Sequence, residues 1–167
     1  MFKPTYTASS AKNIDYKKLK EMGITTLFFD LDNTFTKPFN KKINDEEIEL
    51  VNRLKSEFNV YVVSNGKEKR VKNYCNDIEG LKYLYESAKP TTKKFKKFVK
   101  DNGISIDNCI FVGDQLFTDI WFANRLNMKS ILVDKITKDE EWWIKAKRIL
   151  EKPFMLSIRK RGNINAN

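Results

Sequence analysis

The sequence predicts an α/β fold: a five-stranded parallel β-sheet with helices on both faces. Short apolar runs alternate with helical patterns along most of the chain, an order typical of parallel sheets. Polar side chains recur where four of these runs end. The 167 residues, 41% of them apolar and 12 of them Phe, are enough for one domain with a substantial core.

The five predicted strands are short and mostly apolar, as expected for strands buried on both faces. They occupy residues 24–29, 60–63, 81–85, 110–112 and 130–133. The segments between them have helical spacing of apolar residues, acidic first turns or a terminating glycine. The predicted helices cover residues 16–22, 45–54, 68–76, 91–102, 117–126 and 140–150.

The composition excludes several kinds of chemistry. The chain has no His, so it cannot use a Ser-His-Asp triad, a phosphohistidine or a His-ligated zinc. Cys75 and Cys109 form no CxxC pair, and we expect both to be reduced and structural, which fits a cytoplasmic location. We find no signal-peptide pattern and no run of about 18 apolar residues, so we expect a soluble or peripheral protein.

The charge is strongly positive, with 32 Lys+Arg against 22 Asp+Glu and a formal net charge of +10. This excess favours an anionic partner: lipid head groups, nucleic acid or a phosphorylated substrate. A solvated Lys-rich surface is the alternative. We interpret the lysines at 93, 94, 96 and 97 as such a solvated helix face.

Asp30 and Asp32 follow the first predicted strand, in the segment Phe-Phe-Asp-Leu-Asp-Asn-Thr. Residues i and i+2 of an extended segment point the same way, so both carboxylates can face one small volume, where their charges repel. A bound divalent cation or phosphoryl group would relieve that repulsion. The alternative is an ordinary Asp/Asn/Thr-rich turn.

Further polar residues follow the later strands. They are Ser64 and Asn65 after the second, Lys89 beyond the third, and Asp114 and Asp119 after the fourth. Taken singly, each has a simpler explanation as a turn, a surface lysine or a helix cap. Ligands of parallel sheets bind at the carboxyl ends of the strands, so together these residues predict one site.

These motifs resemble the four motifs of the haloacid dehalogenase (HAD) superfamily of phosphatases, which lie on a Rossmann-like sheet. Residues 30–34 match Asp-x-Asp-x-Thr, Ser64 ends an apolar strand, Lys89 is the lone lysine, and residues 113–119 match Gly-Asp followed by a second Asp. The resemblance covers the chain from the first to the last predicted strand. Residues 33–63 and 66–88 are too few for the cap domain that many members carry.

The resemblance implies an Mg²⁺-dependent phosphatase. In that reaction Asp30 would be the nucleophile, forming an aspartyl-phosphate, and Asp32 would be the general acid and base. The residues implied in binding the substrate phosphate are Ser64, Asn65 and Lys89. The residues implied in binding Mg²⁺ are Asp30, Asp32 through its backbone carbonyl, Asp114, and Asp119 through water.

More closely, the chain resembles the YqeG family of HAD subclass IIIA, which is related to mitochondrial phosphatidylglycerophosphate phosphatases. The matching residues are 30–34, 64–65, 69–71, 88–90, 112–119 and 124–126. The chain departs from the family at Gly66, at residues 121–123 and in a shortened carboxyl end. The resemblance implies hydrolysis of phosphatidylglycerophosphate to phosphatidylglycerol.

We expect residues 1–167 to form one capless domain with a core at about residues 15–135 and a basic, aromatic helical segment at about 139–161. The paired Trp142 and Trp143, with Arg159, Lys160 and Arg161 beyond them, suit a helix lying on anionic lipid. The alternative is a final helix whose Trp side chains pack on the sheet. Adjacent residues do not share one helix face, so one Trp can pack on the sheet while the other faces lipid.

We therefore expect a phosphatase acting on a lipid phosphate, cytoplasmic or peripheral on the inner membrane surface. The +10 charge and the open site leave a second enzymatic alternative: a phosphatase of nucleic-acid ends, nucleotides or another phosphorylated macromolecule. The third alternative is a basic binding module that retains the fold without turnover.

Overall fold

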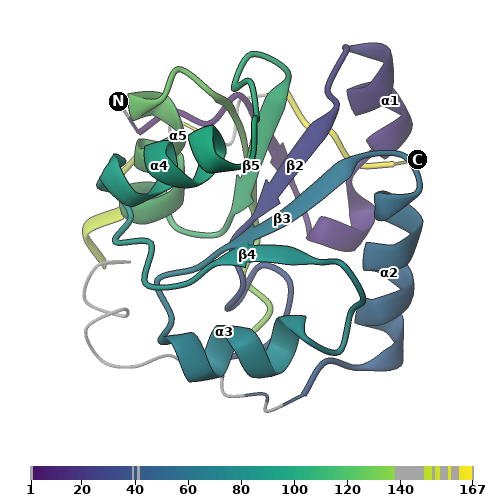
Figure 1. The fold of residues 1–167 in the computed structure, drawn as a ribbon. Coiled ribbons are helices and arrows are strands. Elements are labelled where there is room, and N and C mark those ends of the chain that lie inside the picture. Colours follow the sequence, from purple (N-terminus) through teal and green to yellow (C-terminus); the bar gives the residue numbers. More distant parts are fainter. Residues whose placement is uncertain are drawn as a thin grey trace.

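The computed structural model describes residues 2–38, 40, 42–137, 149–151, 153–154, 158 and 162–166. Within these residues a six-stranded parallel sheet has the order β1-β6-β5-β2-β3-β4 (Figure 1). The strands are β1 Tyr6–Ala8, β2 Thr26–Phe29, β3 Asn59–Val63, β4 Lys82–Leu84, β5 Cys109–Gly113 and β6 Lys129–Val133. The parallel α/β architecture is confirmed. The five predicted strands correspond to β2–β6, and the prediction missed β1.

The helices connect the strands in the predicted order. They are the short η1 Ala11–Asn13, then α1 Tyr16–Glu21, α2 Asp45–Lys55, α3 Glu68–Cys75, α4 Lys93–Asp101, the π-helical η2 Leu116–Ile120 and α5 Trp121–Arg125. Of the helix predicted at 140–150, residues 140–148 lie outside the described residues. No helix in the described ranges combines the length and apolarity that a bilayer crossing needs.

Local sequence explains where α1 and α2 begin and where α1 ends. Asn44 accepts a hydrogen bond from the Glu47 backbone N–H, and the Glu47 carboxylate accepts one from the Asn44 backbone N–H, forming a capping box at the start of α2. Asp15 caps α1 by accepting from the Lys18 N–H. Gly23 follows α1 with a φ of +78°, a conformation that glycine adopts without strain.

Helices cover both faces of the sheet (Figure 1). Leu27 and Phe29 of β2 lie in the hydrophobic cluster that includes residues of α1, α2 and α3. Phe28 points to the other face and lies with Phe95 of α4 and Phe122 of α5, at 4.9 Å between the Phe28 and Phe95 ring centroids. Because neighbouring strand residues face opposite ways, a strand covered on both sides is mostly apolar, and all four β2 residues are buried, with Thr26 as the one polar member.

Both cysteines are free and buried. Burial raises the pKa of the Cys75 thiol to about 12 and that of Cys109 to about 11. Neither thiol is ionised near neutral pH, so both behave as small apolar core residues, in line with the structural role expected from the sequence.

β1 lies at one edge of the sheet, paired with β6. The chain near its carboxyl end runs beside β1, because Ile164 N–H donates to the Thr7 carbonyl at 2.9 Å and the Ile164 carbonyl accepts from Asp15 N–H at 2.8 Å. Ile164 is buried and belongs to the main core cluster. The three-residue β1 has no extended apolar run, which is why periodicity does not predict it.

The strand order creates a switch point between β2 and β5. From β2 the chain adds β3 and β4 on one side of the sheet, then returns to place β5 on the other side of β2. Ligands of open α/β sheets bind in the crevice outside the carboxyl ends of the strands at such a point. The pairing of Phe29 with Val112 therefore sets which residues meet there.

Candidate active site

Asp30 and Asp114 lie at the ends of the two strands that flank the switch point. Asp30 directly follows β2, and its backbone N–H donates to the Val112 carbonyl at 2.9 Å, which continues the sheet ladder. Asp114 directly follows β5. Both residues are buried, so the sheet register fixes two carboxylates beside each other away from bulk solvent.

Asp119 joins them from η2. Its Oδ2 accepts a hydrogen bond from Gln115 N–H at 3.1 Å, and its residue is 1% exposed. Gly113 allows this approach, because a Cβ at that position would lie 2.4 Å from the Asp119 Cβ. The absence of a side chain at Gly113 thus lets Asp119 pack against the end of β5.

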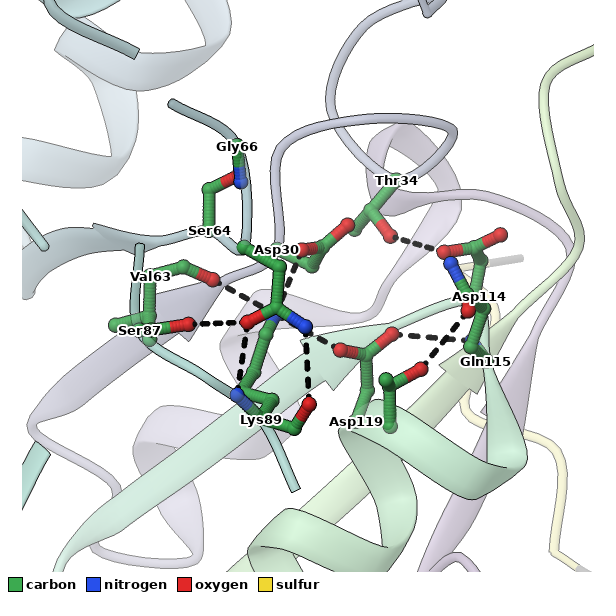
Figure 2. A network of polar contacts seen from close by, with 12 residues as sticks. Asp30, Thr34, Val63, Ser64, Gly66, Ser87, Lys89, Asp114, Gln115 and Asp119 are labelled. Atoms are coloured by element: carbon green, nitrogen blue, oxygen red, sulfur yellow. Dashed lines mark hydrogen bonds and ion pairs between the residues drawn. The ribbon is translucent and has the colours of Figure 1, made fainter. Parts of the chain in front are cut away.

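These three aspartates form a compact carboxylate cluster. One oxygen from each of Asp30, Asp114 and Asp119 lies within 4.8 Å of the others. Thr34 Oγ1 donates to Asp114 Oδ1 at 3.3 Å and orients that carboxylate (Figure 2). Carboxylate oxygens are the ligands that hard divalent cations prefer, so this cluster could hold one.

Lys89 supplies the positive charge in the site. Its Nζ lies 2.6 Å from Asp30 Oδ1 and 2.8 Å from Asp119 Oδ1, and it donates to the Val63 carbonyl at 2.8 Å (Figure 2). Its three N–H donors thus have three acceptors. The side chain is 1% exposed, and its ammonium also lies 4.9 Å from the centroid of the Phe111 ring.

The pKa values of Asp30 and Lys89 reflect this mutual burial. Burial raises the pKa of Asp30 well above its usual range; Lys89 opposes the rise, whereas Asp119 and Asp114 add to it. Burial acts to lower the pKa of Lys89, but the neighbouring Asp119 and Asp30 outweigh it and raise that pKa. Lys89 therefore stays cationic, and Asp30 ionises more readily when further positive charge is bound.

Ser64 directly follows β3, the neighbour of β2, and is buried. Its Oγ accepts a hydrogen bond from Gly66 N–H at 3.0 Å. A hydroxyl both accepts and donates hydrogen bonds, so the Ser64 hydroxyl can also donate one to a phosphoryl oxygen.

The Asn65 side chain is used inside the protein. Its Oδ1 accepts from Ser87 Oγ and from Lys89 N–H, both at 2.8 Å, and its Nδ2 donates to the Lys89 carbonyl at 3.0 Å. Ala88, which lies between Ser87 and Lys89, has a φ of 60°, a left-handed conformation unusual for a residue other than glycine. Asn65 thus holds the strained loop that presents Lys89, and its predicted contact with phosphate stays a prediction.

Asp32 has a different environment from Asp30. Its Oδ1 accepts from Arg70 Nη2 at 2.8 Å, and its side chain is 35% exposed. The next residue, Asn33, has a φ of 67°, so the extended backbone ends here. The carboxylate cluster does not include the Asp32 side chain among the described residues. The predicted role of its backbone carbonyl in metal binding stays a prediction.

Three residues at the site lie outside the predicted set: Thr34, Arg70 and Ser87. Thr34 is the last residue of the Asp-x-Asp-x-Thr motif, so the sequence contained a signal for it. Arg70 lies in the segment 69–71 that supports the YqeG resemblance, but its pairing with Asp32 depends on how α3 packs. We find no sequence signal for Ser87.

The sequence also matches a known family. The family described as mitochondrial PGP phosphatase matches residues 1–137 of this chain. The chain belongs to this family. The probable phosphatase YqeG of Bacillus subtilis is 28% identical over 164 residues, covering 98% of this chain and 95% of that relative. Phosphatidylglycerophosphate phosphatase 1 of Arabidopsis thaliana is 25% identical over 150 residues, covering 84% of this chain and 43% of that protein.

Solved structures share the fold of this family member. A predicted HAD-like hydrolase from Porphyromonas gingivalis aligns with a TM-score of 0.52 at 12% identity, covering 77% of this chain and 98% of that one. A HAD family enzyme from Bacteroides thetaiotaomicron, in complex with magnesium and inorganic phosphate, aligns with a TM-score of 0.51 at 15% identity, covering 72% of this chain and 98% of that one. The chain thus has a HAD fold and, as a member of this phosphatase family, is a phosphoric monoester hydrolase.

We predict that Gly113→Ala destabilises the protein and distorts the carboxylate cluster. The added Cβ must displace Asp119 or β5, which should lower the free energy of unfolding by about 1–3 kcal/mol and weaken binding of a divalent cation. Urea denaturation and calorimetric Mg²⁺ titration measure the two effects. Gly162→Ala is the matched control, because among the described residues its Cβ would meet only Tyr6, at 3.8 Å. Equal stability and Mg²⁺ affinity in both variants would contradict the prediction.

Proposed function

We propose that this protein is an Mg²⁺-dependent phosphatase that hydrolyses phosphatidylglycerophosphate through an aspartyl-phosphate on Asp30. The observation that supports it most is the buried cluster of Asp30, Asp114 and Asp119 with the ammonium of Lys89 between two of them. The cluster supplies a nucleophile, oxygen ligands for a metal and a fixed cation at the carboxyl edge of a parallel sheet.

The charges of the cluster favour a divalent cation. Three carboxylates and one ammonium leave a net charge of −2 when all four groups are ionised, and the groups are buried. Asp30, Asp114 and Asp119 would hold Mg²⁺, with the Asp32 carbonyl as a further ligand. When bound, Mg²⁺ would offset the charge of the phosphoryl group and favour the ionised form of Asp30.

In the first step an Asp30 carboxylate oxygen attacks phosphorus. The new oxygen–phosphorus bond forms as the bond from phosphorus to the leaving alcohol breaks, and Asp32 donates its proton to the departing oxygen. Ser64 donates a hydrogen bond to a phosphoryl oxygen, and Lys89 offsets the negative charge that Asp30 and the phosphate bring together.

In the second step water attacks the phosphorus of the aspartyl-phosphate. Asp32, now ionised, accepts a proton from this water as the bond from Asp30 to phosphorus breaks, which releases inorganic phosphate and restores the Asp30 carboxylate and the protonated Asp32 carboxyl group. The chain has no His, so a carboxylate is a natural acid and base here. The partly exposed position of Asp32 lets the leaving oxygen, and then the attacking water, reach its carboxyl group.

Three observations support the lipid as substrate. The chain belongs to a family described by PGP phosphatase activity, and a relative is named for phosphatidylglycerophosphate. The net charge of +10 favours an anionic surface. Between β2 and β3 the described residues form one helix, α2, and no cap, so a bulky substrate can reach the site.

We predict that Asp30→Asn lowers phosphate release by about a thousandfold or more, because an amide cannot form the acyl phosphate. Phosphate release from phosphatidylglycerophosphate in mixed micelles measures the effect. Asp101→Asn, at an exposed i,i+4 ion pair with Lys97, should retain full activity. Full activity of Asp30→Asn would rule out Asp30 as the nucleophile.

We predict that removal of divalent cations abolishes turnover and that Mg²⁺ restores it. Mg²⁺ should also raise the melting temperature of the metal-free protein, because a ligand that binds only the folded state stabilises it. Asp114→Asn should lose most of this thermal shift, because it replaces an anionic carboxylate ligand with a neutral amide. Unchanged turnover in excess chelator would contradict the metal requirement.

We predict that kcat/KM for phosphatidylglycerophosphate exceeds that for a terminally phosphorylated oligonucleotide by at least about tenfold, the ratio expected from a modest difference in transition-state binding. Both substrates are anionic, so the comparison separates lipid recognition from the effect of net charge. Phosphate release from the oligonucleotide alone would exclude the lipid and favour the nucleic-acid alternative.

A further inference from the structure

The ion pair of Asp32 and Arg70 lies beside the buried carboxylate cluster, in a more open position. Arg70, in the first turns of α3, donates from Nη2 to Asp32 Oδ1 at 2.8 Å. The side chain of Arg70 is 21% exposed and that of Asp32 is 35% exposed, whereas that of Lys89 is 1% exposed. A molecule entering the site can therefore reach the guanidinium without unfolding the cluster.

The hydrogen bonding of Arg70 is incomplete. Its Nη1 is buried and has no hydrogen-bond partner among the described residues. Its other contacts are a long hydrogen bond from Nη2 to the Lys37 carbonyl at 3.5 Å and a cation–π contact with Tyr74 at 5.8 Å. A buried donor without an acceptor is energetically costly and rare in proteins, so this side chain has an unused capacity to bind an anion.

We propose that Arg70 binds a second anionic group on the leaving alcohol of the substrate and so determines specificity. This inference rests on the proposed role of Asp32 as the acid that protonates the leaving oxygen. That role places the leaving alcohol next to Asp32, and the Arg70 guanidinium is in direct contact with the same carboxylate. An anion one short linker away from the leaving oxygen comes within reach of Arg70.

A phosphodiester on a glycerol linker fits this arrangement. The guanidinium presents two parallel N–H groups that match two phosphate oxygens. A turn of the Arg70 side chain away from Asp32 would bring the buried Nη1 to the diester together with Nη2. Arg70 would then release its hydrogen bond to Asp32 and bind the diester, which leaves the Asp32 carboxyl free to act on the leaving oxygen. A substrate without the second anion leaves Arg70 on Asp32 and gains no such contact.

Three substrates test this role. Phosphatidylglycerophosphate and its deacylated, soluble form both carry the second phosphate, whereas glycerol 3-phosphate lacks it. In Arg70→Ala, kcat/KM should fall about 10- to 100-fold for the first two and less than about threefold for the third. Arg70→Lys should fall between wild type and Arg70→Ala, because an ammonium keeps the charge without the planar fork.

Lys72→Ala is the matched control for loss of one positive charge. Lys72 lies on the same helix, two residues from Arg70 and therefore on another face, and is held by Glu68 at the surface. It should leave all three substrates unaffected. Thermal unfolding of each variant checks its fold, and Arg70→Lys and Arg70→Gln provide the test if Arg70→Ala does not fold.

Two results would overturn the role of Arg70 while leaving the phosphatase intact. An equal loss for all three substrates would mean that Arg70 only positions Asp32. A loss restricted to the lipid, with none for its deacylated form, would mean that Arg70 contacts the lipid surface and not the diester. Failure of the wild-type protein to release phosphate from any of the three with Mg²⁺ would instead overturn the proposed function and this inference together.

Discussion

The buried ammonium of Lys89 is the contact on which the site depends. It lies between Asp30 and Asp119, and without it the low dielectric of the interior would make adjacent buried carboxylates very costly. Other features serve this contact: Asn65 fixes the Lys89 backbone, and Gly113 leaves room for Asp119. At this edge of the sheet the Lys89 ammonium therefore offsets part of the negative charge of the carboxylate cluster, and a divalent cation would offset the rest.

The two carboxylates of the Asp-x-Asp motif differ because their surroundings differ. Asp30 is buried in the cluster, at the end of a strand whose register fixes its backbone. Asp32, beyond the end of that strand, is partly exposed and paired with an arginine. Carboxyl groups in such unlike environments can perform unlike tasks, a nucleophile in one case and a proton carrier in the other. Asp32, the more exposed of the two, is also the one whose partner, Arg70, is proposed to bind the second anionic group of the substrate.

The sequence predicted the features that local pattern determines. Five strands were identifiable from apolar runs, and Asp30 and Asp114 from their position where buried strands end. The sequence did not predict the side-chain contacts of Asn65 or the Asp32–Arg70 pair. These contacts join segments that are brought together by helix packing and loop conformation. β1 was missed because three edge residues show no periodicity.

The edge strand β1 has a consequence for the order in which the chain assembles. Thr5 donates to the carbonyl of Ser130, 125 residues away, and the backbone near Thr7 meets Ile164 near the other end of the chain. Contacts between residues so far apart close large loops and form late. During synthesis β2, β3 and β4 can pair while β1 still has no neighbour, so the first strand to be made is among the last to join the sheet.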